Sequence, residues 1–218
     1  MEIKPKATRT KAAKQTFVGF VLDKSGSMTS MQQEIVNVFN DQKKVVMKNA
    51  RKGGKTLTTM VQFGATRTPV EVIFEHKAPS NIPILDSSTY RPEGMTPMYD
   101  GIGQTISLLE AKDDGGADTA FLVVVFSDGG ENSSKEWNSK MIAEKISALQ
   151  DTGRWSFVYL GANQDLTKVR DTLGLSAGNM FDWNNDTALA SNVMASGTSK
   201  YFASRDVGIT STDCYVSK

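Results

Sequence analysis

Two uninterrupted apolar segments, each followed by an aspartate, constrain the fold of this chain more than any other feature. The run from Phe17 to Leu22 ends at Asp23, and the run from Ala120 to Phe126 is followed by Asp128. Continuous apolar strands are typical of parallel sheets that are covered on both faces. Because the carboxyl ends of such strands meet at one edge of the sheet, we expect the chemistry of this chain at that edge.

Strand patterns alternate with helical patterns along the rest of the chain. We expect strands at 17–22, 56–65, 69–76, 120–126, 155–160 and 179–183, and helices at 29–47, from 96 to about 112, through 142–149, at 164–173 and at 186–202. This order predicts an α/β fold with a doubly wound, mostly parallel sheet of about six strands. One strand of the hairpin at 56–76 should be an antiparallel edge strand, and helices should cover both faces.

Local signals predict how two of the helices begin. Ser30 and Gln33 have the spacing of a capping box for the helix at 29–47. Thr96 has the residue type of an N-cap, with Pro97 at the first helical position. Gly101 and Gly103 lie inside that second helix, where each costs about 1 kcal/mol relative to alanine. We therefore expect this helix to pack closely against the sheet.

Length and composition indicate one domain with no general attraction to polyanions. The chain has 218 residues and a formal net charge of +1, which favours neither nucleic acid nor membrane as a partner. We expect a basic polar arm at 1–16, a domain at 17–202 and a tail at 203–218. The arm lacks the apolar segment of a secretory signal, so we expect a cytoplasmic or virion-associated protein. The single cysteine, Cys214, is expected to be an inert thiol.

The segment Asp23-Lys24-Ser25-Gly26-Ser27 places three oxygen-bearing side chains at alternate positions. It follows a buried strand and precedes a helix, so the three oxygens can converge on one point. Hard cations such as Mg²⁺ take oxygen ligands at about 2.0–2.1 Å in an octahedron and usually keep some water. One carboxylate and two hydroxyls fill half of such a shell.

This segment resembles the DxSxS signature of the metal-ion-dependent adhesion site (MIDAS) of von Willebrand factor type A (VWA) domains. In that family a threonine and an aspartate from two further loops complete the site. Their counterparts here are Thr96, in GMTPMYD, and Asp128, in FSDGG. The chain is most similar to small stand-alone VWA proteins of bacteria and phages. The predicted metal ligands are Asp23, Ser25, Ser27, Thr96 and Asp128.

The resemblance implies a metal-dependent protein-binding or assembly module that is not an enzyme. Mg²⁺ is the expected ion, with Mn²⁺ or Ca²⁺ as alternatives, and the expected partner is a protein that presents an Asp or Glu carboxylate. An oligomer is compatible with this function. Ser127 stands where the family more often has threonine, and we expect that difference to matter little because the residue is not a ligand.

Other polar residues near these motifs carry weaker expectations. Asp100 is expected to hydrogen-bond a site water or the loop backbone, rather than to bind the metal directly. Glu131 fits two interpretations equally, a rim residue that selects the partner or a solvated loop acid. His76, the single histidine, is expected to have a structural or surface role.

Two alternative functions remain open at this stage. The chain could be a structural subunit of a virion or another large assembly, with the metal site occupied by a neighbouring chain. It could also be a Mg²⁺-dependent phosphotransfer enzyme, because phosphatases of the haloacid dehalogenase type carry a DxDx(T/V) motif after the first strand of a similar sheet. Ser25 stands where that motif needs its second aspartate, the general acid, which disfavours the enzyme.

Overall fold

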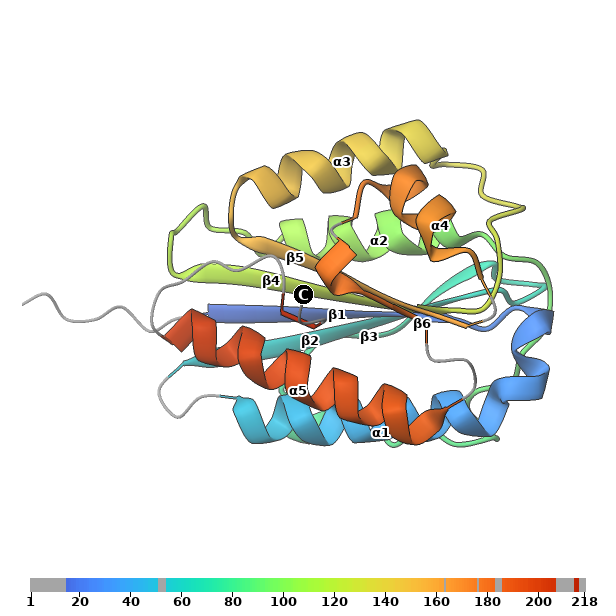
Figure 1. Cartoon of the computed structure of the whole chain (residues 1–218), viewed down its shortest axis with the longest axis horizontal. Helices are drawn as coiled ribbons and strands as arrows, with labels where there is room; N and C mark the ends of the chain where they lie inside the picture. The colour runs from blue at the N-terminus through green and yellow to red at the C-terminus, as the bar shows by residue number, and fades with distance from the viewer. Residues whose placement is uncertain are drawn as a thin grey trace, which may run out of the picture.

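The computed structural model describes residues 15–50, 54–162, 164–175, 177–182, 186–206 and 214–215. Residues 1–14 of the predicted arm and most of the predicted tail lie outside this set, so the domain boundaries remain predictions. The described elements form one sheet with helices on both sides (Figure 1). No helix within the described residues is long and apolar enough to cross a membrane.

Six strands of the described chain form a sheet in the order β3-β2-β1-β4-β5-β6. The hairpin strand β3 runs antiparallel to β2, and the other neighbouring pairs are parallel. The bounds are β1 Gln15–Asp23, β2 Lys55–Phe63, β3 Val70–Lys77, β4 Thr119–Ser127, β5 Trp155–Gly161 and β6 Met180–Asp182. The predicted doubly wound sheet with an antiparallel edge strand is confirmed.

The helices form one layer on each face of the sheet. In Figure 1, α1 and α5 lie on one side, and α2, α3 and α4 lie on the other. The bounds are α1 Gln32–Asn49, α2 Met98–Glu110, α3 Ser139–Asp151, α4 Leu166–Leu173 and α5 Thr187–Asp206, with short 3-10 helices η1 Gly26–Met31, η2 Pro79–Asn81 and η3 Ala177–Asn179. Every residue of β4 is buried between the two layers, which explains its unbroken apolar sequence.

Both predicted helix starts are wrong in detail. The 3-10 helix η1 precedes α1, whose N-cap is Met31 without a side-chain cap, so Ser30 lies inside η1 and forms no capping box. The N-cap of α2 is Pro97, and Thr96 precedes that cap, two residues before the helix begins. In both cases the loop that carries the predicted ligands ends later than the local sequence indicates.

The close packing predicted for α2 is confirmed at Gly101 and takes a different form at Gly103. A Cβ atom on Gly101 would lie 2.7 Å from Cδ1 of Phe63, on β2 of the sheet. A Cβ atom on Gly103 would lie 2.3 Å from Nε1 of Trp137, which belongs to the loop after β4. The absence of a side chain at Gly101 therefore lets α2 pack against the sheet, and its absence at Gly103 makes room for the Trp137 indole.

The strand β1 lies close against α2 at Gly19. A Cβ atom there would lie 2.6 Å from Cγ2 of Thr105 and 3.0 Å from Cδ1 of Leu109. Both residues are fully buried, so neither can move aside freely. The absence of a side chain at Gly19 allows α2 to lie directly over the central strand that carries the DxSxS motif.

We predict that Gly19→Ala lowers the free energy of unfolding by roughly 1–3 kcal/mol through overpacking. Thr105→Ser removes Cγ2 but keeps the hydroxyl that donates to the carbonyl oxygen of Gly101 at 2.9 Å. Gly19→Ala should therefore cost less in the Thr105→Ser background than in the wild type. Urea denaturation measures both, with Gly130→Ala as the control because a Cβ there meets nothing within 4 Å. Equal costs in the two backgrounds would contradict the proposed contact.

Candidate metal centre

The structure brings the three predicted ligand loops to the carboxyl edge of the sheet. Asp23 is the last residue of β1, and Asp128 directly follows the last residue of β4. Because β1 and β4 are parallel neighbours, the two acids lie at the same edge, as the sequence predicts. Ser25 and Ser27 lie at the start of η1, and Thr96 lies two residues before α2.

The oxygens of three predicted ligands are spaced as neighbours in an octahedral shell. The hydroxyl oxygens of Ser25 and Ser27 are 3.1 Å apart, and the Ser27 hydroxyl donates to Oδ1 of Asp128 at 2.7 Å. Adjacent ligands of an octahedral cation with bonds of 2.0–2.1 Å lie about 2.9 Å apart. These oxygens therefore fit a magnesium-sized ion without a large rearrangement.

Thr96 reaches the same place from the second loop. A Cβ atom on Gly129 would lie 3.4 Å from the Ser27 hydroxyl oxygen and 3.7 Å from the Thr96 hydroxyl oxygen. Both hydroxyls therefore border one small space beside the backbone of Gly129. Within the described chain the Thr96 hydroxyl makes no hydrogen bond, which leaves its oxygen available as a ligand.

Asp23 is fully buried and is held by hydrogen bonds to both carboxylate oxygens. The N–H of Ser25 donates to Oδ1 at 2.7 Å, and the hydroxyl of Ser127 donates to Oδ2 at 2.5 Å. Burial raises the pKa of Asp23 to about 6, although the bonds from Ser127 and Ser25 act in the opposite direction. The Tyr90 hydroxyl donates to the carbonyl oxygen of Asp23 and fixes the backbone as well.

Ser127 has a role that the sequence did not reveal. We expected it to matter little because it is not a predicted ligand, yet its hydroxyl orients the buried carboxylate of Asp23. The sequence feature that could have indicated this role is the small hydroxyl residue directly before the aspartate of the third loop. Its function is to direct a carboxylate on the neighbouring strand.

The two carboxylates repel each other weakly and share a dehydrated environment. Burial raises the pKa of Asp128, opposed by the hydrogen bond from Ser27, and the charge of Asp128 further raises the pKa of Asp23. A cation at this edge would reverse both shifts because it stabilises the ionised forms. In the part of the chain that the structure describes, no three His, Cys, Asp or Glu side chains are placed to hold a metal ion together. Three of the five predicted ligands here are hydroxyls.

Backbone contacts hold the first and second loops together. The N–H of Gly26 donates to the carbonyl oxygen of Gly94 at 3.1 Å, and the N–H of Glu93 donates to that of Lys24 at 2.7 Å. Gly94 has a φ of 76°, and a Cβ there would lie 2.0 Å from the carbonyl oxygen of Gly64. Glycine at position 94 therefore lets the second loop lie directly on the backbone that follows β2.

The other polar residues near the motifs have structural roles. Asp100 accepts hydrogen bonds from backbone N–H groups of the loop after β4. This confirms the expected bond to the loop backbone. Glu131 is not a solvated loop acid, because it accepts bonds from Tyr99 and two loop serines, and its role as a rim residue stays a prediction. His76 contacts the carbonyl oxygen of Leu108, in agreement with a structural role.

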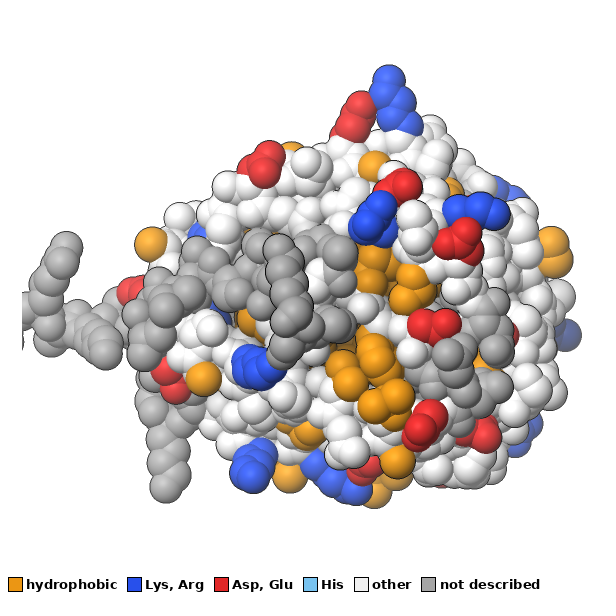
Figure 2. All heavy atoms as spheres, in the orientation of Figure 1, with side chains coloured by type: hydrophobic (Ala, Val, Ile, Leu, Met, Phe, Trp, Pro, Cys, Tyr) orange, Lys and Arg blue, Asp and Glu red, His pale blue; other side chains and the backbone are white. Residues whose placement is uncertain are grey.

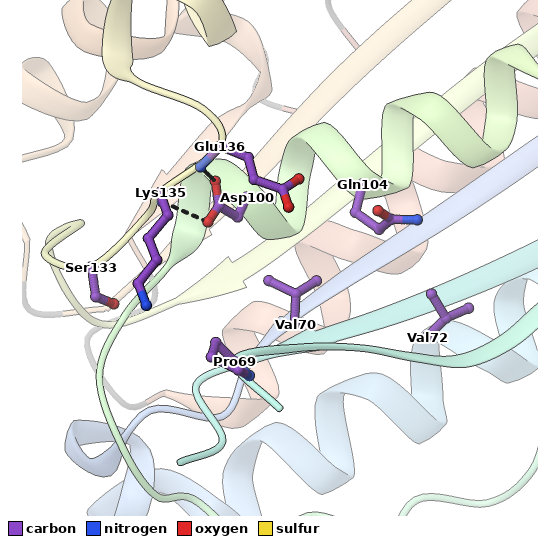
Figure 3. Close-up of a pocket in the computed structure, with 8 residues that line it drawn as sticks. All are labelled: Pro69, Val70, Val72, Asp100, Gln104, Ser133, Lys135 and Glu136. Carbon is purple, nitrogen blue, oxygen red and sulfur yellow. Dashed lines mark hydrogen bonds between the residues drawn. The ribbon is translucent and has the colours of Figure 1, made fainter. Parts of the chain in front are cut away.

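A cavity of about 440 Å³ lies beside this edge, between β3, α2 and the loop after β4 (Figure 3). Val70 and Val72 form its apolar floor, and Asp100, Gln104 and Lys135 form its walls. None of the five predicted metal ligands lines this cavity. The cavity and the candidate metal centre are therefore separate features of the surface.

A comparison with models of protein families found no match, and neither did a comparison with curated protein sequences. Solved structures do match. Proximal thread matrix protein 1 of the mussel byssus is 18% identical with a TM-score of 0.62, and the match covers 86% of this chain and 46% of that one. A second structure of that protein is described as having a zinc-occupied MIDAS motif.

Two further solved structures have a similar fold. Manganese-loaded TRAP of Plasmodium vivax is 16% identical with a TM-score of 0.57, over 81% of this chain and 72% of that one. A von Willebrand factor type A protein from Catenulispora acidiphila is 14% identical with a TM-score of 0.57, over 87% and 43%. The chain thus spans less than half of the byssus protein and of the Catenulispora protein. At these identities the likeness establishes the architecture: the chain has the von Willebrand factor type A fold.

Proposed function

We propose that this chain is a divalent-metal-dependent protein-binding or assembly module. Asp23, Ser25, Ser27, Thr96 and Asp128 would hold the ion, with Mg²⁺ as the expected metal. The observation that carries the proposal is the octahedral spacing of oxygens from the first and third loops beside the buried carboxylate of Asp23, with the Thr96 hydroxyl bordering the same space. Hydroxyl and carboxylate oxygens are the ligands that hard cations prefer.

The composition of the site favours a carboxylate as the partner group. A divalent cation carries two positive charges, and the proposed ligand set contains only two acids, so the ligands do not make the site negative overall. Ser25, Ser27 and Thr96 contribute neutral oxygens. Asp128 is half-buried and already bonded to Ser27, so it would hold the ion directly or through a water. An Asp or Glu of a partner protein is then the natural additional ligand.

The solved structures support the metal and the general role. One of them is described as manganese-loaded and another as having a zinc-occupied MIDAS motif, which supports a divalent ion without selecting magnesium. The byssus protein is described as a thread matrix protein. A role in holding proteins together is consistent with these descriptions.

We also propose that the chain is not an enzyme. Asp23 has hydrogen bonds to both carboxylate oxygens and no exposed surface, so it is poorly placed to attack a substrate. Ser25 occupies the position where a phosphotransfer enzyme of the haloacid dehalogenase type needs an acid, and a hydroxyl cannot replace that proton donor near neutral pH.

We predict that chelator-treated protein binds Mg²⁺ and Mn²⁺, and that Asp23→Ala abolishes the binding. Isothermal titration calorimetry measures both. Asp151→Ala is a matched control, because Asp151 is an exposed aspartate at the end of α3 that leads to the opposite edge of the sheet. The control should bind like the wild type. Wild-type protein that binds neither ion would contradict the proposed function.

A second prediction follows from the buried carboxylate. Burial raises the pKa of Asp23 to about 6, whereas an aspartate in the unfolded chain titrates near pH 3.9. The folded protein therefore binds this proton more tightly, so the resulting stability is complete below about pH 4 and is lost as the pH rises to about 6. In chelator, Asp23→Asn should become more stable than the wild type across this window, by on the order of 3 kcal/mol above it.

Urea denaturation between about pH 4 and pH 7.5 measures this difference, with Asp151→Asn as the control. Added Mg²⁺ should reduce the difference above pH 6, because the ion stabilises ionised Asp23 in the wild type and gains little from the amide. A stability difference that does not change with pH would show that Asp23 titrates normally.

A third measurement separates an adaptor from an assembly subunit. Size-exclusion chromatography with Mg²⁺ and with chelator compares the oligomeric state of the same protein. If a neighbouring copy supplies the carboxylate, the protein should elute as an oligomer with Mg²⁺ and as a monomer in chelator, and Asp23→Ala should elute as a monomer in both. A wild-type monomer in both conditions favours a different protein as the partner.

A further inference from the structure

The loop that follows β4, residues 128–138, is fastened to the start of α2 by a continuous set of hydrogen bonds. The predicted ligand Asp128 begins this loop, and the predicted ligand Thr96 lies two residues before α2. Figure 3 shows one part of the connection, where the carboxylate of Asp100 on α2 faces the backbone at Lys135 and Glu136. The connection therefore joins the second and third ligand loops.

Asn132 bonds both backbone polar groups of Thr96. Its Oδ1 accepts from the N–H of Thr96 at 2.8 Å, and its own N–H donates to the carbonyl oxygen of Thr96 at 3.1 Å. The two bonds close a ring. The backbone of Thr96 cannot move relative to the loop of Asp128 unless both bonds break.

Glu131 extends the connection into the first turn of α2. Its Oε2 accepts from the N–H of Tyr99 at 2.9 Å, and its Oε1 accepts from the N–H groups of Ser133 and Ser134 at 2.7 Å each. The first N–H groups of a helix lack partners within the helix, and α2 has no side-chain cap from its own N-cap residue. A carboxylate is favoured at this end of a helix, so Glu131 supplies the missing cap from another loop.

Asp100 makes the reciprocal bonds from the helix to the loop. Its carboxylate accepts from the N–H groups of Lys135, Glu136 and Trp137 at 2.8, 3.0 and 2.8 Å. The Trp137 indole then lies against Gly103, where a Cβ would clash with it. The loop and the helix therefore hold each other at several independent points.

We propose that Asn132 and Glu131 are positioning residues of the metal site, which fix the Thr96 hydroxyl relative to Asp128. The two loops then present their oxygens as one preformed pair, so binding an ion costs little additional ordering. This inference rests on the proposed metal-binding function. Residues that orient metal ligands typically contribute 10–100-fold to metal affinity.

The test compares Mn²⁺ affinity, measured by calorimetry, among single variants of the full chain. Asn132→Ala removes the acceptor of the Thr96 N–H and should weaken Mn²⁺ binding by about 10–100-fold. Asn132→Asp keeps an acceptor oxygen and should restore most of the affinity. Ser133→Ala is the matched control, because the Ser133 hydroxyl has no partner among the described residues, and it should bind like the wild type.

Thermal unfolding in chelator distinguishes positioning from a general loss of stability. Asn132 is exposed, so Asn132→Ala should keep a melting temperature close to that of Ser133→Ala while its affinity falls. If Asn132→Ala does not fold, Glu131→Gln replaces it, and its weaker Mn²⁺ binding is the expected result. Wild-type affinity in these variants overturns the inference and leaves the proposed function intact. A wild-type protein that binds no Mn²⁺ overturns both.

Discussion

The burial of one carboxylate at the end of the central strand is the constraint on which the candidate metal centre depends. Asp23 has no exposed surface, and its charge is opposed by desolvation and by the nearby Asp128. Two neutral donors, the Ser25 N–H and the Ser127 hydroxyl, offset part of this cost. They cannot neutralise the charge, so ionised Asp23 remains a buried negative charge without a positive partner. A cation beside it would stabilise the ionised form.

The rest of the site can be understood as support for that carboxylate. The hydroxyls of Ser25 and Ser27 extend the oxygen surface from Asp23 toward Asp128. The backbone bonds between the first two loops fix Thr96 on one side, and the bonds from Asn132 fix it on the other. Backbone hydrogen bonds join the first loop to the second, and the buried side chains of Met28, Leu85 and Tyr90 also belong to one apolar cluster.

The sequence predicted the architecture well because the two layers of helices bury all of β4 and all of β1 after Gln15. The resulting apolar runs, each followed by an aspartate, mark both the strands and the edge where the site lies. The five predicted ligands gather at that edge, but the sequence did not show that Ser127 orients Asp23. It also did not show that Glu131 caps α2, because that bond joins residues 32 positions apart in the chain. Local patterns place residues on elements, whereas contacts between loops depend on the folded backbone.

The polarity of the sheet places the candidate metal centre at the edge opposite the start of β1. The strand β1 starts at Gln15 and carries Asp23 at its other end. The end of α5 is anchored at the starting edge too, where the Arg205 guanidinium donates to the carbonyl oxygen of Asp118, just before β4. A tether or fusion joined before β1 would therefore leave from the side opposite Asp23 and Asp128. The edge with the candidate metal centre would then stay free to face a second surface.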